Sequence, residues 1–456
     1  MRDWFIVPVL AAAFGAAASA HVGSPDVFFQ GKAGPYPLLI AIRPPDAIPG
    51  VARIEVRALG AGVQKVELTP TPMTGPAAKH PPVADVAVRS AADPRYFEGA
   101  LWLMSVGAWE VHVRVSGAQG TAELPVPVPA VAIRTAPMEK GVGYFLFGMM
   151  LFLTVGLVAI VGAAVRESKL DPGVKPRGWS RSAIGCMSFT AVLLAAALWF
   201  GKSWWADDAR NYSRKLYKPL MVTASLNAAK RLDLRLTDPG WLALRKLDDI
   251  VPDHGKPMHF FLIRLPAMDE FFHLHPEEVA AGYFSTSLPS LPGGTYKMFA
   301  DVVHESGLAE TAIGEVILPD VKGATLTGDD AGGAIPNSGS SIRWVHDPSS
   351  AIVAKQVTLF TFEVPDDIEP YMGMGGHAEF VKDDGSVFAH VHPSGSVSMA
   401  SMAVASREAM MQMHQLQSGR SVSFPYGLPL AGNYHVFVQI RHGGKIDTGA
   451  FAVQGR

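Results

Sequence analysis

The chain of 456 residues contains a single cysteine, Cys186. One thiol excludes a disulfide within the chain, and it also excludes the paired cysteines of zinc ribbons, c-type haem attachment sites and thioredoxin-like motifs. Charged residues make up only 18% of the chain and the formal net charge is −2, so there is no basic field that would attract nucleic acid. Any metal site must therefore use histidine, methionine, carboxylate or backbone ligands, and no nucleic-acid partner is expected.

The sequence also lacks the motifs of many common enzymes: it has no GxSxG, HExxH or P-loop segment, and no GxGxxG in a strand–helix context. Apolar residues, in contrast, are abundant at 48%. Residues 1–20 have the features of a signal peptide, with Arg2, an apolar run from Trp4 to Ala13, and small residues up to Ala20. An uncleaved membrane anchor is the alternative for this segment.

Two further apolar runs, residues 141–165 and 182–201, carry no charge and are long enough to cross a membrane. Basic residues outnumber acidic ones in the segment between them, residues 166–181. The positive-inside rule therefore predicts that this loop is cytoplasmic and that both large flanking regions lie outside. The predicted location is the bacterial inner membrane, with both large regions periplasmic. A buried helical hairpin of a soluble protein is the alternative.

Both flanking regions contain short runs of alternating apolar and polar residues separated by turn residues, a pattern typical of antiparallel β-sandwiches. We expect a mainly β fold with three antiparallel β-sandwich domains and a two-helix transmembrane hairpin. The sandwiches are expected at residues 21–138, 217–320 and 342–456. Residues 321–341 are rich in glycine, serine and aspartate, which predicts a linker between the second and third sandwiches.

The second and third sandwiches are predicted to be an internal repeat that carries a set of histidines. In each, one histidine begins an apolar run, a His-x-His-Pro segment follows, and a last histidine lies eight residues after a tyrosine. These residues are His259, His273, His275 and His304 in the first repeat, and His377, His390, His392 and His442 in the second. We refer to residues 217–320 as repeat A and to residues 342–456 as repeat B.

Strand geometry predicts that these histidines converge, because alternate residues of a strand share one face. In repeat B, Asp384-Gly385 predicts a two-residue hairpin turn, which places His377 opposite His392 with His390 on the same face. A short loop at 266–268 predicts the same arrangement in repeat A. Cross-strand side chains start about 5 Å apart, within reach of one ion. The last histidine of each repeat is expected to close the site from a third strand.

Several imidazoles that converge without balancing carboxylates suit Cu(II), Zn(II) or Ni(II). Met372 and Met374 lead into the site of repeat B, and thioethers prefer Cu(I), so copper is the expected metal and zinc the alternative. Further methionines between residues 399 and 413 are either additional ligands or the packing face of a helix.

Some residues outside the repeated histidines are also candidates. Cleavage after Ala20 would make His21 the first mature residue, whose free amine and imidazole can chelate copper; cleavage that happens to fall there is the alternative. Asp301, Glu305 and Glu379 are expected to orient imidazoles.

The exported domains resemble the FixH/YtkA-like group of bacterial β-sandwich modules in their strand pattern and in the segment from Leu291 to Tyr296 followed by Ala300-Asp301. The resemblance implies copper handling or oxidase assembly, with a periplasmic metalloprotein or an oxidase-assembly factor as partner. His21 resembles the N-terminal histidine of CopC-like periplasmic copper carriers. The chain departs from the FixH-like pattern in its additional domains and its two-span hairpin.

Taken together, the residues predict a membrane-anchored periplasmic metal-binding protein, with copper as the metal and sequestration, sensing or delivery as the role. A cupin-like metalloenzyme is one alternative, because His273, His275, Glu278 and His304 loosely imitate a cupin site. A metal-free structural or interaction protein built of β-sandwiches is the other.

Overall fold

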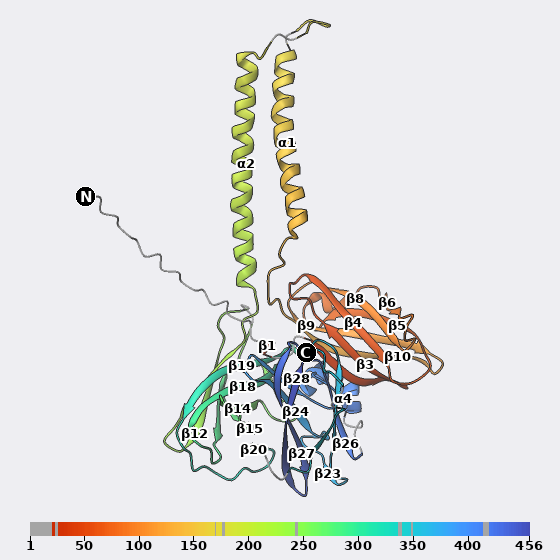
Figure 1. Ribbon diagram of the computed structural model, residues 1–456, viewed down its shortest axis with the longest axis vertical. Helices are drawn as coiled ribbons and strands as arrows, with labels where there is room; N and C mark the ends of the chain where they lie inside the picture. Colours follow the sequence, from red (N-terminus) through yellow and green to blue (C-terminus); the bar gives the residue numbers. More distant parts are fainter. Residues whose placement is uncertain are drawn as a thin grey trace, which may run out of the picture. The chain divides into compact units, whose positions relative to one another are not determined.

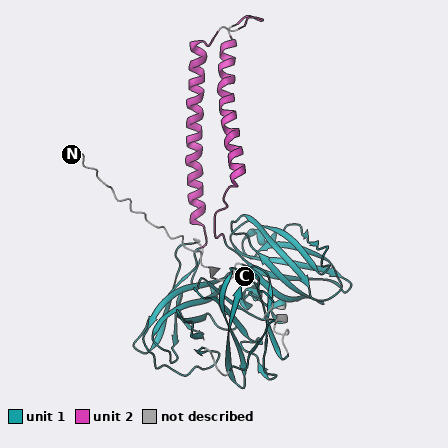
Figure 2. Cartoon of the chain, viewed as in Figure 1, with its two compact units in different colours: residues 1–131, 218–456 teal, residues 132–217 magenta. Residues whose placement is uncertain are grey.

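The computed structural model describes residues 21–22, 26–168, 170–175, 178–241, 245–335, 340–347, 350–413 and 419–456 (Figure 1). The predicted signal peptide, residues 1–20, lies outside this set. The described chain is mainly β, with antiparallel sheets and two long apolar helices, which confirms the predicted fold class. It divides into two compact units: residues 1–131 with 218–456, and residues 132–217 (Figure 2).

The smaller unit is a pair of helices, α1 (Lys140–Glu167) and α2 (Arg181–Arg214). Both are long and apolar enough to cross a membrane, and their side chains are almost entirely unburied. The two helices contact each other at Gly162, where a side chain would collide with Met187. The helices confirm the two predicted apolar spans, although α2 continues well beyond residue 201. The unit begins and ends at adjacent positions, because the Tyr217 amide donates to the Ala132 carbonyl oxygen at 2.7 Å.

The N-terminal part of the larger unit is a sandwich of two sheets. One has the strand order β2-β3-β4-β8-β7 and the other β10-β9-β5-β6. Alternate residues of these strands point between the sheets and are fully buried, which explains the alternating pattern of the sequence. The strands are β2 (Val27–Ala33), β3 (Tyr36–Arg43), β4 (Gly50–Ala58), β5 (Val63–Pro72), β6 (Asp85–Val86), β7 (Val88–Arg89), β8 (Tyr96–Leu103), β9 (Gly107–Gly117) and β10 (Gly120–Ala130), with a 3-10 turn at Pro76–Lys79.

Repeat A forms one continuous sheet of ten strands around its own apolar core, in the order β16-β17-β12-β11-β19-β18-β14-β15-β20, with β13 paired to β18. Its strands are β11 (Met221–Leu226), β12 (Arg231–Thr237), β13 (Ile250–Val251), β14 (His259–Leu265), β15 (Glu270–Leu274), β16 (Glu277–Ala280), β17 (Tyr283–Ser287), β18 (Gly294–His304), β19 (Ala309–Leu318) and β20 (Ala331–Ala334).

Repeat B packs a six-stranded sheet, β1-β25-β24-β27-β23 with β28 on β27, against the three strands β21-β22-β26. Its elements are β1 (His21–Val22), β21 (Arg343–Val345), β22 (Thr358–Glu363), β23 (Ile368–Glu369), β24 (His377–Lys382), β25 (Val387–Val391), α3 (Met399–Ala405), α4 (Arg407–Met413), β26 (Ser421–Tyr426), β27 (Gly432–His442) and β28 (Lys445–Gly455).

The stretch expected to be a linker is part of the fold instead. Val321 pairs with Leu291, and β20 adds to the edge of β15 in the sheet of repeat A. Gly332 makes this pairing possible, because a Cβ at its position would lie 2.4 Å from the carbonyl oxygen of Phe271. The glycines that suggested a flexible linker therefore allow a close approach of two backbones.

The N-terminal sandwich is joined to repeat B through strand β2. The Gln30 amide donates to the Ser394 carbonyl oxygen at 2.7 Å, and Phe28 is buried in the core of repeat B, edge-on to Tyr426. The three β-rich segments thus form one compact unit.

Candidate metal centre

The two predicted histidine hairpins form with the predicted registers. In repeat A, β14 and β15 pair Phe260 with Leu274 and Phe261 with His273, which places His259 opposite His275. In repeat B, β24 and β25 pair Ala378 with Val391 and Glu379 with His390, which places His377 opposite His392. These pairings confirm both predicted registers. The registers could be predicted because the length of the turn sets the register of a hairpin.

Repeats A and B bring the histidine-bearing faces of these hairpins together. Apolar residues from both repeats make a shared core beside the histidines, in which Phe299 of β18 stacks on Phe388 of β25 with ring centroids 4.2 Å apart. Phe271 stacks on Phe437 across the same boundary at 4.3 Å. This core fixes the distance between the two sets of histidines, which lie in a single buried cluster.

Seven imidazoles make up the cluster: His254, His259, His273, His275, His377, His390 and His392. Within it, two groups have ligand atoms that all lie within 4.8 Å of one another. We call His259, His273 and His275 the first position, and His254, His377 and His392 the second position. The two positions are contiguous, since the rings of His259 and His254 are 5.8 Å apart.

His254 is a member of the second position that was not among the predicted ligands. It lies in the loop before β14, and its ring centroid is 5.2 Å from that of His377 and 5.0 Å from that of His392. The signal was present in the repeat itself: His254 precedes His259 by the same five residues as Met372 precedes His377. The second position therefore takes ligands from both repeats.

In several of these imidazoles one N–H is held by an oxygen acceptor. Since a carbonyl oxygen can only accept, Nδ1 of His254 donates to Met372 at 2.7 Å, and Nδ1 of His392 donates to Val397 at 3.1 Å. Nε2 of His259 donates to the Asp253 carbonyl and Nε2 of His377 to the Tyr371 carbonyl, both at 3.3 Å. Neutral imidazole has one donor nitrogen, so the other nitrogen of each ring is left with a lone pair.

These lone pairs point at one another. Nε2 of His254 is 3.3 Å from Nε2 of His392, although the other nitrogen of each ring already carries the hydrogen. Nδ1 of His259 is 3.1 Å from Nε2 of His273, and Nδ1 of His377 is 3.0 Å from Nε2 of His390. Nitrogen lone pairs that face each other without a hydrogen between them repel, and a shared cation removes that repulsion.

Oxygen acceptors from the opposite repeat orient the two central histidines. Nδ1 of His273 donates to Oε1 of Gln439 at 2.8 Å, and Nδ1 of His390 lies 3.4 Å from a carboxylate oxygen of Asp301. Gln439 and Asp301 occupy corresponding places, because each pairs with the first histidine of its own repeat, His377 and His259. The expectation that Asp301 orients an imidazole is met, and Glu379 also lies near His390, at 4.0 Å. No contact of Glu305 with an imidazole occurs among the described residues.

His275 is oriented by the stretch that was expected to be a linker. A single oxygen, Oδ1 of Asp330, accepts from both the backbone amide and Nδ1 of His275, each at 2.9 Å. Nε2 of His275 is buried and has no hydrogen-bond partner. Such a nitrogen is costly to bury unless an ion or another donor occupies the space in front of it.

Burial keeps five of the imidazoles uncharged. It lowers the pKa of His259, His273, His377 and His390 well below the usual value, and neighbouring imidazoles lower these pKa values further. Burial and the adjacent His254 lower the pKa of His392 to about 4. Neutral imidazole is the form that binds metal, so these five side chains are already in the required state near neutral pH.

Two carboxyl groups, the half-buried Asp301 and the buried Glu379, lie beside His390 of the cluster. Burial raises the pKa of Asp301 to about 7, against a hydrogen bond from Thr311 that lowers it. Burial and the nearby Asp301 raise the pKa of Glu379 well above its usual value. Both oxygens of Glu379 are buried without a hydrogen-bond partner.

His304 and His442 do not join the cluster, contrary to the expectation from strand parity. The register of β18 places Asp301, not His304, beside His259, and His304 pairs with Ile250 further along the strand. Its ring nitrogens lie 2.7 Å from Asp249 and 3.1 Å from Glu310, and although burial disfavours the charged ring, these carboxylates raise its pKa. His442 in repeat B is placed in the same way, 2.9 Å from Asp367.

The other candidate ligands have different outcomes. Met372 lies in the loop that contacts His254, whereas Met374 is buried and pairs with Tyr371 within the same loop. The backbone of His21 is in β1, paired with Val387, and its side chain lies outside what the structure describes. Met399 and Met402 are buried in helix α3, where they serve packing.

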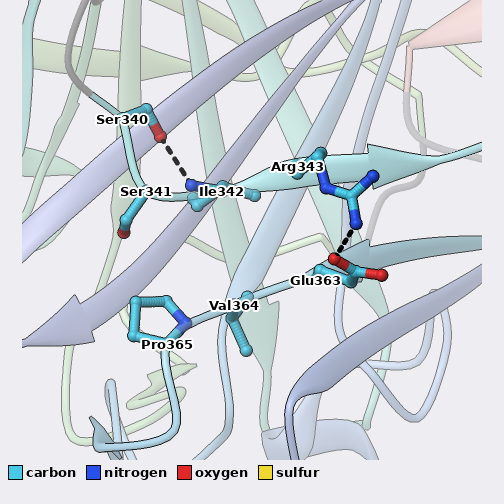
Figure 3. Close-up of a pocket in the computed structure, with 7 residues that line it drawn as sticks. All are labelled: Ser340, Ser341, Ile342, Arg343, Glu363, Val364 and Pro365. Carbon is cyan, nitrogen blue, oxygen red and sulfur yellow. Dashed lines mark hydrogen bonds and ion pairs between the residues drawn. The ribbon is translucent and has the colours of Figure 1, made fainter.

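A shallow surface depression elsewhere in repeat B contains none of the cluster histidines. It is lined by residues of β21, β22 and their flanks, and Figure 3 shows the ion pair between Arg343 and Glu363 at its edge. Ser340 accepts a hydrogen bond from the Ile342 amide beside it. This depression has no chemistry that connects it to the metal centre.

Comparison with known proteins identifies one domain. Residues 341–455 match a family described as a domain of unknown function (DUF8832), and this segment coincides with repeat B. The match covers less than half of the chain. No curated protein matches the chain.

Similar solved structures are distant. A tetra-tandem repeat in the extending region of a large adhesion protein is 12% identical with a TM-score of 0.17, over 90% of this chain and 71% of that one. A putative membrane anchored protein from Corynebacterium diphtheriae is 10% identical with a TM-score of 0.16, over 94% and 96%. Salmonella alpha-2-macroglobulin is 10% identical with a TM-score of 0.21, over 98% of this chain but only 24% of its own length. These likenesses establish neither a common fold nor a common function.

Proposed function

We propose that this chain is a membrane-anchored metal-binding protein that binds copper in a histidine cluster shared by repeats A and B. The observation that carries the proposal is the set of imidazole nitrogens that face one another at 3.0 to 3.3 Å while the opposite nitrogen of most of these rings is held by an oxygen. Imidazoles fixed in this way by outer partners are typical of metal ligands.

Copper is favoured over zinc by the combination of donors. Imidazole binds Cu(II) and Zn(II) alike, but thioethers favour Cu(I), and the backbone of one methionine, Met372, contacts His254 of the cluster. Buried neutral imidazoles can bind either oxidation state, which suits a protein that sequesters copper or passes it to a partner. A periplasmic metalloprotein or an oxidase-assembly factor, as the FixH/YtkA-like resemblance implies, is the proposed recipient.

The cellular location belongs to the same proposal. The helices α1 and α2 suit membrane anchoring, and basic residues such as Arg166 and Arg181 border the loop between them. The positive-inside rule then places this loop in the cytoplasm and the histidine cluster in the periplasm of a bacterial cell.

The test is the metal content of the full-length chain, purified in detergent, saturated with Cu(II) or Zn(II) and desalted. We expect about two ions per chain, with about one lost in the double variant His273→Ala/His275→Ala and about one in His390→Ala/His392→Ala. His254→Asn should weaken the second position although it lies in repeat A. His346→Asn, a histidine that stacks on Trp344 away from the cluster, is the matched control and should keep both ions.

Unchanged stoichiometry in both double variants would contradict metal binding and favour a structural or interaction role for the β-rich unit. Loss of only one ion in total would instead indicate a single shared site.

A further inference from the structure

The last histidine of the repeat B hairpin, His392, is followed by a tight turn. The backbone of His392 pairs with that of Gly395 through two hydrogen bonds of 2.7 and 2.8 Å. Val397, two residues further on, accepts the hydrogen from Nδ1 of His392 at 3.1 Å. The shape of this turn therefore sets the direction of the His392 ring. We call residues 394–396 the turn segment.

Strand β2 of the N-terminal sandwich lies along the turn segment. The Gln30 amide donates to the Ser394 carbonyl oxygen at 2.7 Å, and the Ser396 amide donates to the Phe28 carbonyl oxygen at 2.9 Å. The Phe28 amide also donates to the Ser396 hydroxyl at 3.1 Å. Because β2 is the outer strand of its sheet, the backbone groups on its open side are available for these bonds.

The contact between β2 and the turn segment is close and buried. Gly395 has a φ angle of 120°, and a Cβ at its position would lie 1.8 Å from the Phe28 carbonyl oxygen. The side chain of Phe28 is fully buried in the core of repeat B. The preceding strand, β1, pairs with β25, the strand that carries His390. The N-terminal part of the chain thus contacts the histidine hairpin of repeat B along its edge and at its end.

The first position is held by other means. The oxygens that accept from its three imidazoles belong to Asp253, Gln439 and Asp330. None of these three residues is part of the N-terminal sandwich. His275 corresponds to His392 in the repeat, but its ring is held by Asp330, next to strand β20. Corresponding histidines of the two repeats therefore depend on different parts of the chain.

We infer that the N-terminal sandwich is a positioning domain for the second position: β2 fixes the turn segment, and the turn segment fixes His392. Coupling between two binding events is reciprocal, so an ion bound by His392 strengthens the contact with β2 as much as that contact strengthens binding of the ion. The inference rests on the proposed function. It gives a role in metal binding to a domain that contributes no imidazole to the cluster.

The variant Gln30→Pro tests the contact. The Gln30 amide bonds to Ser394 and not to β3, so proline removes this donor without removing a hydrogen bond of the β2–β3 pair. Zinc affinity is measured by competition with an indicator, on the full-length chain in detergent. Gln30→Pro should lower it about 10-fold in His273→Ala/His275→Ala, which keeps the second position. It should leave it unchanged in His390→Ala/His392→Ala, which keeps the first.

A matched control lies on the same strand. Lys32→Pro places proline two residues further along the same edge, beyond the turn segment, and should change neither affinity. Gly395→Ala disturbs the contact from the side of repeat B and should reproduce the effect of Gln30→Pro. No loss of affinity at the second position in Gln30→Pro would overturn the inference. So would an equal loss at both positions, which would indicate a general loss of stability.

Hydrogen–deuterium exchange, followed by mass spectrometry, tests the reciprocal effect. Zinc should slow exchange in peptides that cover residues 27–31 and 394–396 when the second position is present, and have no such effect when only the first remains. Exchange in residues 27–31 that does not respond to zinc at the second position would contradict the coupling. Failure of the unmodified chain to bind any ion would instead overturn the proposed function.

Discussion

A histidine that is buried without charge behaves differently toward metal from one on a surface. An exposed imidazole begins to be protonated near pH 6.5, and a proton then competes with the metal for the same lone pair. Burial lowers the pKa values of His259, His273, His377 and His390 well below the usual value, and that of His392 to about 4. Proton competition therefore begins only at a more acidic pH.

We accordingly predict that zinc affinity at the first position changes little between pH 7.5 and 6. Competition titrations with a zinc indicator, performed on the His390→Ala/His392→Ala variant, measure this position alone. A hexahistidine peptide under the same conditions should lose affinity over that range, because its imidazoles are exposed. A tenfold or greater loss in the protein would contradict the burial argument.

The residues that were predicted correctly are those whose placement depends on local geometry. His273 and His275 share a face because of strand alternation, and a short turn sets the register of each hairpin. His254 was missed because its contribution depends on packing between two repeats, which no local pattern encodes. His304 was misplaced because it shares parity with Tyr296, whose face of β18 packs into the core of repeat A, whereas the opposite face carries Asp301 beside His259.

At the scale of elements, strand β20 and the loop before it have a role that composition concealed. Asp330 holds both the backbone amide and the ring of His275, so this edge of the sheet orients a ligand. The glycine-rich sequence predicted a linker here, because glycine is common in flexible segments. Glycine also lets two backbones come close together, and at Gly332 it allows β20 to approach Phe271 where no side chain would fit.

We predict that Asp330→Ala lowers metal affinity at the first position by about 10- to 100-fold while the saturated metal content stays unchanged, because His275 keeps its nitrogen but loses its orientation. Isothermal titration of the two variants gives affinity and stoichiometry together. Asp320→Asn is a suitable control, since Asp320 also accepts from a backbone amide, that of Gly293. Equal affinity of Asp330→Ala and the unmodified chain would show that β20 is not needed for ligand orientation.

At the scale of the whole molecule, the helical hairpin is an insertion in a β-rich unit. The described chain leaves the larger unit at Val131 and returns at Lys218, and the hydrogen bond between Ala132 and Tyr217 brings the two ends of the hairpin together. The apolar runs that predicted the helices are easily recognised, because a membrane-length segment without charge has few other uses.

We predict that replacing residues 133–216 by a short glycine–serine linker yields a protein that stays in the soluble fraction without detergent and keeps its full metal content. Ultracentrifugation and metal analysis test the two parts of the prediction separately. A shortened chain that is soluble but lacks metal would contradict the prediction that the β-rich unit binds metal without the two helices.

The origin of the ligands has a consequence for how the protein matures. His254 and His259 come from the first repeat, whereas Gln439, which orients His273, comes from one of the final strands of the chain. A nascent chain that has folded only its first repeat has four of the seven imidazoles and none of the partners that repeat B supplies. The proposed loading with metal therefore requires a chain whose carboxyl-terminal strands have already folded.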